Sequence, residues 1–273
     1  MRTSVGGLLF VWLAVATSAA EDIQWAKNWD EAQKAAASGG KLIMVDFFTD
    51  WCVWCKRLDK DTYANADVIK LSREFVNLKT DAEKEGLSLA KKYGVSGFPT
   101  ILFLDNSGEV VGRIGGYMPP GPFAKEVTRI RDAHADLPKL EARLKANPDD
   151  GETNARLAEI MAMRGKRAEA EAAIAKAETA KYTGESLARA YNGVADAYQS
   201  DQKLDQAVAL FKKADAMSKD AETRAYAKIS ILSCHNAAGN RDAAKAVARE
   251  LVELKDAPAD MVEMAKKYLA QDE

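Results

Sequence analysis

Cysteine and proline are both scarce in this sequence, which has 3 cysteines and 7 prolines among 273 residues. A fold held together by structural disulfides usually has an even number of widely spaced cysteines, so such a framework is not expected here. The few prolines and the 17 glycines argue against extensive disorder. The net charge of −2 gives no broad attraction to nucleic acid or to an anionic membrane, and we expect no nucleic-acid partner.

Charge is nearly absent from residues 1–20, where Arg2 is the only charged residue. An apolar run over residues 8–16 is followed by the small residues Ser18-Ala19-Ala20. This order is typical of a secretory signal peptide, and the run is shorter than the ~20 apolar residues of a membrane-spanning helix. We therefore predict a signal peptide over residues 1–20 and export to the bacterial periplasm. An uncleaved anchor is the alternative, and the segment has no cysteine for lipid attachment.

Two of the cysteines lie close together in Trp51-Cys52-Val53-Trp54-Cys55-Lys56. An apolar, strand-like run over residues 42–48 precedes this segment, and a helical pattern follows it. Two cysteines at this spacing, between a strand and a helix, indicate dithiol–disulfide chemistry, and a disulfide persists in an oxidising compartment. The third cysteine, Cys234, shares an apolar helix face with Ile231, so we expect a small buried side chain there.

The pattern of apolar residues before residue 137 alternates between helices and strands. A helical pattern runs over residues 25–37, with Asn28 as a plausible N-cap, and further helices are predicted over residues 52–71 with a break near 64–66, 87–93 and 123–137. Strands are predicted over residues 41–48, 75–80, 99–104 and 109–114. The last two strands flank the turn Asn106-Ser107-Gly108 and should form a hairpin. This order predicts an α/β domain over residues 21–136, with a mixed central sheet and helices on both faces.

Three segments of this region resemble thioredoxins: residues 45–56 resemble the active-site segment, residues 93–100 the cis-proline segment, and residues 108–116 the terminal hairpin. The exported thiol:disulfide interchange proteins are the most similar subgroup. The resemblance implies a thioredoxin-like disulfide oxidoreductase. It also implies that Pro99 is cis and lies beside the cysteines.

The two cysteines of the motif are expected to have different roles. Cys52 should lie at the N-terminus of a helix, where the helix dipole and free N–H groups stabilise a thiolate, so we assign it as the nucleophile. Cys55 lies one turn later and should resolve the mixed disulfide, forming a Cys52–Cys55 disulfide.

Asp46 interrupts an otherwise apolar strand. Burial raises the pKa of a carboxyl group, so Asp46 could exchange a proton near pH 7. In the family, an acid six residues before the first cysteine acts on the resolving cysteine, and Asp46 has this spacing. The family's lysine partner falls at Asn77, which leaves Lys79 or Lys56 as substitutes. The alternative is a strand-end aspartate that reaches solvent or a backbone N–H.

Pro99 and three aromatic residues complete the predicted site. The resemblance implies that Phe98 flanks the cysteines and that a substrate strand pairs beside Pro99. A trans proline that opens a strand is the alternative. Trp51, Trp54 and Phe98 could form an apolar patch for unfolded or peptide substrates, although core packing is also open for Trp54.

The residues between the cysteines bear on the direction of the chemistry. Val53-Trp54 differs from the Gly-Pro of cytosolic thioredoxins and contains no histidine, which favours a reducing or isomerising role. Without a second Cys-X-X-Cys motif, we expect no zinc site and no cofactor. Capture of copper by the dithiol with Met118 is a further alternative. The expected partners are proteins with disulfides or thiols and an unidentified electron-exchange partner.

From residue 137 onward, alanine becomes frequent and strand patterns disappear. Pro138 and Asn147-Pro148-Asp149-Asp150-Gly151 are expected to break the chain on either side of a linker helix, which we place at residues 137–150. His134, just before it, should be a packed histidine rather than a ligand.

The remainder, residues 151–273, is repetitive. Equivalent residues recur every 37 positions, as in the series Ala170, Ala207, Ala244 and the series Leu157, Val194, Ile231. Each unit should contain two amphipathic helices, as in tetratricopeptide repeats, although the period exceeds the usual 34 and the repeat-ending proline is missing. We predict an all-α repeat domain that binds a peptide or protein. Alternatively, it only packs on the first domain or forms a dimer. A thioredoxin-like domain followed by such repeats also resembles the chaperedoxins, which suggests a redox-linked chaperone as the alternative function.

Overall fold

The computed structural model describes residues 22–272, so the predicted signal peptide lies outside the described residues. The first part of the chain is built on a five-stranded sheet with the order β1-β3-β2-β4-β5. Its strands are β1 (Trp25–Ala26), β2 (Ile43–Phe48), β3 (Val76–Asp81), β4 (Thr100–Leu104) and β5 (Val110–Gly115). The first three are parallel to one another, whereas β4 runs antiparallel to both β2 and β5, so the sheet is mixed as predicted.

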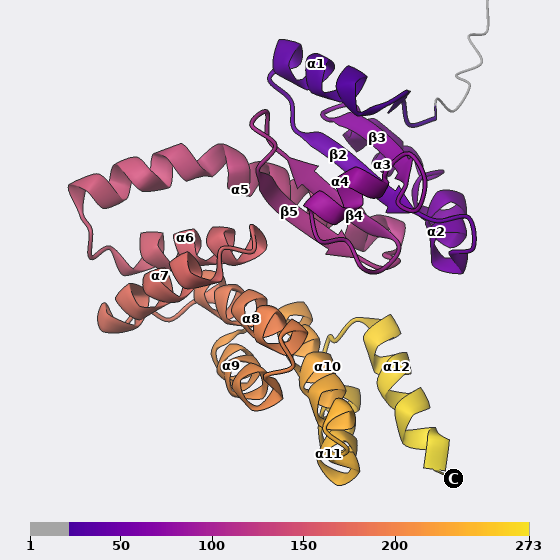
Figure 1. Cartoon of the computed structure of the whole chain (residues 1–273). Coiled ribbons are helices and arrows are strands. Elements are labelled where there is room, and N and C mark those ends of the chain that lie inside the picture. The colour runs from indigo at the N-terminus through magenta and orange to yellow at the C-terminus, as the bar shows by residue number, and fades with distance from the viewer. Residues whose placement is uncertain (1–21, 273) are drawn as a thin grey trace, which may run out of the picture.

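Helices cover both faces of this sheet (Figure 1). They are α1 (Trp29–Gly39), α2 (Val53–Arg57), which continues into a π-helical turn (Leu58–Thr62), α3 (Ala66–Ser72), α4 (Leu87–Lys92) and α5 (Pro120–Ala146). The alternation of β2 fixes the two faces. Ile43, Val45 and Phe47 pack towards α1 and α4, whereas Met44 packs towards α3, α5 and the π-helical turn. The predicted thioredoxin-like fold class is confirmed.

Two local predictions were wrong. Trp25 lies in β1 and not in the first helix, which begins at Trp29 after the cap residue Asn28. Pro138 does not break the chain either, because α5 continues through it to Ala146. A proline inside a helix costs about 3 kcal/mol. Burial of Ala133 and Leu140, on either side of Pro138, against the helices that follow offsets this cost.

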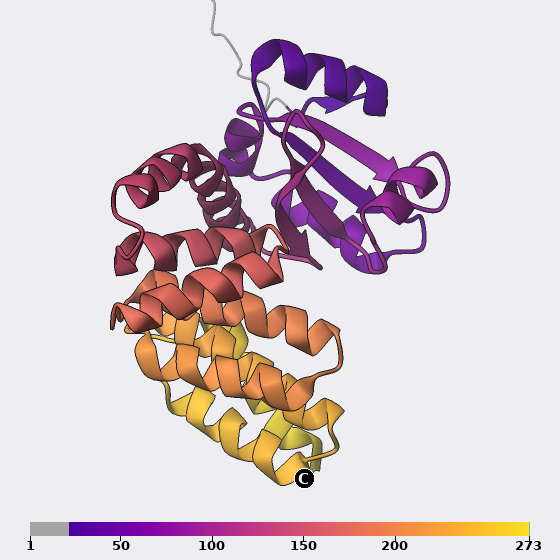
Figure 2. The same cartoon turned by 60° about the vertical axis from the view of Figure 1, so that its left-hand side comes forward.

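The second part of the chain is entirely helical. It contains α6 (Gly151–Met163), α7 (Arg167–Thr179), α8 (Glu185–Ser200), α9 (Leu204–Met217), α10 (Ala221–Ala237), α11 (Arg241–Glu253) and α12 (Ala259–Leu269). These helices stack one after another away from the sheet (Figures 1 and 2). The all-α region that follows the α/β domain is therefore confirmed. Within the described residues, no helix combines the length and the apolar character that a membrane span requires.

The repeat is visible in the turns that join α6 to α7, α8 to α9 and α10 to α11, which we call the three helix pairs. Gly165, Gln202 and Gly239 occupy equivalent positions, and their φ angles of 74°, 60° and 76° are all left-handed. Glycine adopts this conformation without steric cost, whereas glutamine does not. The backbone therefore repeats even where the glycine is missing.

α5 belongs to both parts of the molecule. Its first half contributes Phe123, Val127 and Ile130 to the core of the sheet domain, and its second half contributes Ala133 and Leu140 to the helical core. The domain boundary that we predict at residue 136 thus falls inside one continuous helix.

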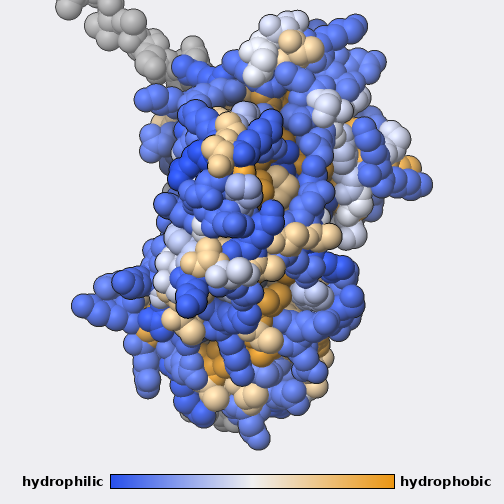
Figure 3. All heavy atoms as spheres, turned by 90° about the vertical axis from the view of Figure 1, so that its left-hand side faces the viewer, coloured by the Kyte–Doolittle hydropathy of each residue, from blue (hydrophilic) through white to orange (hydrophobic). Residues whose placement is uncertain are grey.

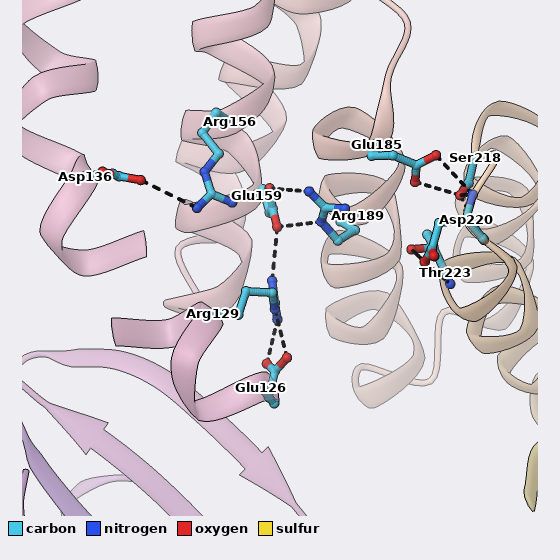
Figure 4. A network of polar contacts seen from close by, with 10 residues as sticks. All are labelled: Glu126, Arg129, Asp136, Arg156, Glu159, Glu185, Arg189, Ser218, Asp220 and Thr223. Atoms are coloured by element: carbon cyan, nitrogen blue, oxygen red, sulfur yellow. Dashed lines mark hydrogen bonds and ion pairs between the residues drawn. The ribbon is translucent and has the colours of Figure 1, made fainter. Parts of the chain in front are cut away.

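A buried carboxylate also joins the two parts. Glu159 of α6 is 2% exposed and accepts from Arg129 of α5 at 3.1 Å, from Arg156 at 2.8 Å and from Arg189 of α8 at 2.7 Å (Figure 4). Arginine fits such a site because its planar fork can donate to carboxylates from several directions. The three cations keep the pKa of Glu159 below its ordinary value despite the opposing effect of burial.

Figure 3 shows the face of the molecule that lies on the left in Figure 1, and most of the surface of that face is hydrophilic. Apolar residues are visible only as patches between charged ones (Figure 3). The apolar faces of the helices seen from this side are therefore mostly turned inward.

Candidate active site

The two cysteines of the motif lie where β2 passes into α2. Cys52 is the N-cap of α2, and its Sγ accepts the backbone N–H of Cys55 at 3.0 Å. Its own backbone N–H donates to the Thr49 carbonyl at 3.1 Å, which closes the turn after the strand. Cys52 and Cys55 form a disulfide in this structure, with their Cα atoms 5.3 Å apart. A backbone donor aimed at Cys52 Sγ would equally stabilise a thiolate there in the reduced protein.

Asp46 lies on β2, on the face opposite Val45 and Phe47, and is 1% exposed. Burial raises its pKa to about 7, an effect that the Lys79 ammonium opposes and the Asp59 carboxylate reinforces. The alternative of a strand-end aspartate that reaches solvent is therefore wrong. An acid with a pKa near neutrality can take up and release a proton at physiological pH.

Lys79 is the cation beside Asp46. The two residues are register partners on β2 and β3, and Lys79 Nζ lies 3.5 Å from Asp46 Oδ2. Asn77 cannot take this part, because its amide donates to the backbone carbonyls of Gln24 and Ser72. Of the two lysines considered from the sequence, Lys79 is the one in contact.

Two neighbours of this pair were missed in the sequence. Asp59 forms an ion pair with Lys79, and the Tyr63 ring lies 5.5 Å from Lys79 Nζ. Asp59 lies in the π-helical turn that continues α2 and Tyr63 is the residue after that turn, four and eight positions after Cys55. Positions four apart share one face of a helix, so this spacing was the signal that could have revealed them.

The cis-proline segment lies next to the cysteine motif. The Phe98–Pro99 peptide bond is cis, and the Pro99 carbonyl accepts the backbone N–H of Gly116 at 2.8 Å. The Phe98 ring meets the Trp51 ring edge-on, with centroids 5.9 Å apart. The fold thus brings Phe98 to Trp51 although nearly fifty residues separate them in sequence.

Apolar side chains around the cysteines face solvent. Val53 is 72% exposed, Trp51 64% and Trp54 53%, so core packing of Trp54 is wrong. The Trp54 ring lies 5.8 Å from the Tyr117 ring, and the Arg57 guanidinium lies 4.7 Å from the Tyr117 ring centroid. The surface around the cysteines is therefore apolar and open to solvent.

The remaining candidate residues lie in packed positions. Cys234 is buried in the helical core with Ile231. His134 Nδ1 lies 3.0 Å from the Arg164 guanidinium, and burial together with that charge lowers its pKa. Met118 packs against the core of the sheet domain. Among residues 22–272, no cluster of three or more histidine, cysteine or acidic side chains is arranged to hold a metal ion.

Comparison with known proteins finds similarity in the first part of the chain. Residues 29–131 match the family model described as Thioredoxin-like domain. The thiol:disulfide interchange protein DsbD of Vibrio cholerae serotype O1 is 37% identical over 141 residues, which cover 47% of this chain and 24% of that protein. The chain therefore spans about a quarter of the length of this relative.

Solved structures match the same part of the chain. A thioredoxin from Thermus thermophilus is 28% identical, with a TM-score of 0.40, over 43% of this chain and 93% of that one. The C-terminal domain of Neisseria meningitidis DsbD in its reduced form is 22% identical, with a TM-score of 0.32, over 36% of this chain and 89% of that domain. From the family model and the sequence similarity to DsbD, residues 29–131 are a thioredoxin-like domain homologous to the thiol:disulfide interchange proteins, and they contain the Cys52–Cys55 pair.

Proposed function

We propose that this protein is an exported thiol–disulfide oxidoreductase that reduces or isomerises disulfides in protein substrates. The observation that carries this proposal is the make-up of one stretch of chain. The Cys52–Cys55 disulfide is flanked by the exposed side chains of Trp51, Val53 and Trp54, and it follows the strand that holds a buried acid whose pKa is about 7. Export rests on the sequence of residues 1–20 alone.

In the reduced protein, the Cys52 thiolate attacks a substrate disulfide. One substrate sulfur leaves as a thiolate, and the other forms a mixed disulfide with Cys52. The Cys55 thiol then transfers its proton to the Asp46 carboxylate, and the resulting thiolate attacks Cys52 Sγ. The Cys52–Cys55 disulfide forms as the mixed disulfide breaks, so the substrate gains two electrons, and an electron-exchange partner must reduce the protein again.

The surface around the cysteines supports a protein substrate. Trp51 and Trp54 offer large apolar rings to an unfolded segment or an extended peptide. We expect the backbone beside Pro99 to pair with that segment, and Phe98 to contact it. In isomerisation, the same thiolate would release a wrong disulfide and return to the reduced form.

The test is reduction of a protein disulfide by the purified protein, supplied with electrons by a dithiol. Cys52→Ser should abolish turnover, because the nucleophile is lost. Cys234→Ala is the matched control, since this buried cysteine lies in the helical core. Wild-type turnover in Cys52→Ser would contradict the proposal.

We also propose that residues 151–273 are tetratricopeptide-like repeats that bind a protein partner, after a linker at residues 137–150. The three helix pairs with their equivalent left-handed turns support this, and α12 packs on α11 as a terminal cap. Cys55→Ser, expressed in its own compartment, should trap partners as mixed disulfides on Cys52. Trapped partners should still bind a Cys52→Ala, Cys55→Ala variant if a second surface recognises them. Loss of all binding with the cysteines would count against that surface.

A chaperone that holds unfolded clients is the second candidate. It is favoured by the exposure of Trp51, Val53 and Trp54, which does not depend on the cysteines being reactive. The Cys52→Ala, Cys55→Ala variant should then still suppress aggregation of an unfolded client. If suppression disappears with the cysteines, this candidate fails.

A further inference from the structure

Asp196 on α8 occupies the same place in its repeat as Glu159 does on α6, because the two positions are one repeat period apart. Each of these acids also contacts the residue that lies thirty positions further along the chain. Glu159 accepts from Arg189 at 2.7 Å, and the Tyr226 hydroxyl donates to the Asp196 carboxylate, 2.8 Å from both of its oxygens. The two acids can therefore be compared as equivalent positions of one repeating structure.

Glu159 shows what satisfies an acid at this position of the repeat. Its carboxylate is 2% exposed and is bonded by three guanidinium groups, which belong to Arg129, Arg156 and Arg189 (Figure 4). These charges keep the pKa of Glu159 below its ordinary value although burial opposes them. The acid of the first repeat is thus fully matched by arginine side chains.

The acid of the second repeat has no such cations. Three positions before Asp196 the chain has Gly193, where the first repeat has Arg156. Thirty positions after Asp196 it has Tyr226, where the first repeat has Arg189. Burial raises the pKa of Asp196 to about 7, the Tyr226 hydroxyl opposes this rise, and no lysine or arginine of the described residues contributes to it. The surroundings of Asp196 therefore lack the positive charge that the equivalent acid has.

Asp196 and Tyr226 are also accessible from outside. Asp196 is partly exposed and Tyr226 is 38% exposed, whereas Glu159 is enclosed. The Tyr226 ring meets the ring of Phe211 on α9 edge-on, with centroids 6.5 Å apart, and this contact holds it beside the carboxylate. An aromatic face attracts a cation, and a guanidinium can stack on such a face while it donates to a carboxylate. The pair thus offers a guanidinium both kinds of contact at once.

We propose that Asp196 and Tyr226 form a recognition site for an arginine side chain of a partner protein, whose guanidinium donates to the Asp196 carboxylate and stacks on the Tyr226 ring. This inference rests on the proposed binding of a protein partner by the repeats, and it names the chemistry that the partner presents. The partner's arginine supplies from outside the charge that Arg189 supplies to Glu159 from within the chain. The carboxylate has room for these bonds beside the one from Tyr226, because its two oxygens offer about four acceptor positions. Lysine fits less well, since its ammonium is a point charge without a flat face to stack.

The test is binding of the peptide acetyl-Ala-Arg-Ala-amide to the whole protein, followed through the NMR signals of the peptide. Binding should be saturable, and the Tyr226 ring signals of the protein should shift with it. Asp196→Asn should weaken the affinity at least tenfold, because a hydrogen bond to a charged group is lost. The matched control is Asp205→Asn, which removes an exposed acid from α9 and should bind the peptide like wild type. The same peptide with citrulline in place of arginine is isosteric and uncharged, and it should also bind at least tenfold more weakly.

A second variant fills the proposed site from within the chain. Tyr226→Arg places a guanidinium where Arg189 stands beside Glu159, so it should pair with Asp196 and abolish binding of the peptide. This variant keeps the carboxylate and adds the charge that the first repeat has, so its circular dichroism should match that of wild type. A folded Tyr226→Arg that binds the peptide as wild type does would overturn the inference. Equal binding by Asp196→Asn, equal binding of the citrulline peptide, or no saturable binding to wild type would overturn it as well.

These measurements need neither disulfide turnover nor a trapped partner. Partners that bind the Cys52→Ala, Cys55→Ala variant, and bind it equally well after Asp196→Asn is added, would refute this site and leave the proposed partner-binding surface standing. Partners that bind only through the cysteines would refute that surface, and the peptide titration would still decide whether Asp196 and Tyr226 bind arginine.

Discussion

The Asp46 carboxylate and the Lys79 ammonium face each other from paired positions on β2 and β3, 3.5 Å apart, with the carboxylate buried and the lysine side chain partly exposed. Lys79 also lies over the rings of Trp25, Phe48 and Tyr63, at 5.9, 5.1 and 5.5 Å from their centroids. Aromatic faces attract a cation and keep water away from it. The positive charge of Lys79 therefore keeps the pKa of the buried Asp46 carboxyl from rising further.

Replacing Lys79 with methionine should raise the pKa of Asp46. Methionine keeps the apolar stem among the aromatic rings and removes the charge. An opposite charge at this distance is worth about one to two pH units, so half-ionisation should move from about pH 7 to above pH 8. The pH dependence of disulfide reduction measures this shift. Lys56→Met is the control. An equal shift in that variant would show that the effect on Asp46 does not depend on the contact with Lys79.

Removing the acid should stabilise the protein at high pH. In the unfolded chain an aspartate ionises near pH 3.9, whereas folded Asp46 holds its proton to about pH 7. Between these values the folded state binds more protons, so the contribution of Asp46 to stability is greatest at low pH and falls as pH rises towards 7. At pH 8 the free energy of unfolding of Asp46→Asn should therefore exceed that of wild type by about 4 kcal/mol, which is about three pH units at ~1.4 kcal/mol each, and the gain should shrink towards pH 4. Urea unfolding at the two pH values measures it. A gain independent of pH, or one shared by the exposed Asp205→Asn, would contradict this account.

The chemistry of this site could be predicted only in part from the sequence. An acid inside an apolar strand is visible as a pattern, so burial of Asp46 follows from Leu42 to Phe48 alone. Its partner depends on the register of two parallel strands separated by thirty residues, which local periodicity does not give. Lys79 and Asn77 point to the same face of β3, and only the pairing shows that Lys79 meets Asp46.

The rule that proline ends a helix failed where tertiary packing outweighs the local cost. Pro138 has no N–H to donate and should end a helix, yet α5 continues because Ala133 and Leu140 are buried against the helical region. Conversely, the exposure of Trp54 could not be read from its type, since tryptophan is common both in cores and at binding surfaces. Its neighbour Tyr117 is too distant in sequence to suggest their contact.

Truncating an exposed tryptophan should affect substrate recognition and not folding. Trp54→Ala removes a ring that is 53% exposed, so the free energy of unfolding should change by less than about 0.5 kcal/mol. The KM for a protein disulfide should rise about tenfold, while reduction of a small disulfide stays near wild type. Met264→Ala, a 57% exposed side chain on α12, is the control. Equal loss on both substrates would instead place Trp54 in the chemical step.

The buried Glu159 carboxylate should contribute far more to the stability of the fold than the carboxylate of an exposed ion pair. Replacing it with alanine leaves Arg129, Arg156 and Arg189 without the carboxylate they share, and removing one partner of a buried ion pair costs about 3–5 kcal/mol. Urea unfolding of Glu159→Ala measures this loss. The exposed pair of Glu263 and Lys267 offers the comparison, since Glu263→Ala should cost less than about 0.5 kcal/mol. A loss for Glu159→Ala as small as that would mean that the network contributes little.

The middle repeat turn gives a test of the repeat itself. Gln202 holds a left-handed conformation at φ 60°, where the equivalent Gly165 and Gly239 pay no steric cost. Gln202→Gly should therefore stabilise the helical region by up to about 1 kcal/mol, because relief of the left-handed strain exceeds the entropy that glycine loses on folding. Gly165→Gln should destabilise it by a similar amount, since that residue would meet the same strain. Thermal unfolding of the two variants measures both stability changes. A destabilised Gln202→Gly would mean that the glutamine side chain makes a favourable contact of its own, and that the three turns are alike in backbone but not in energy.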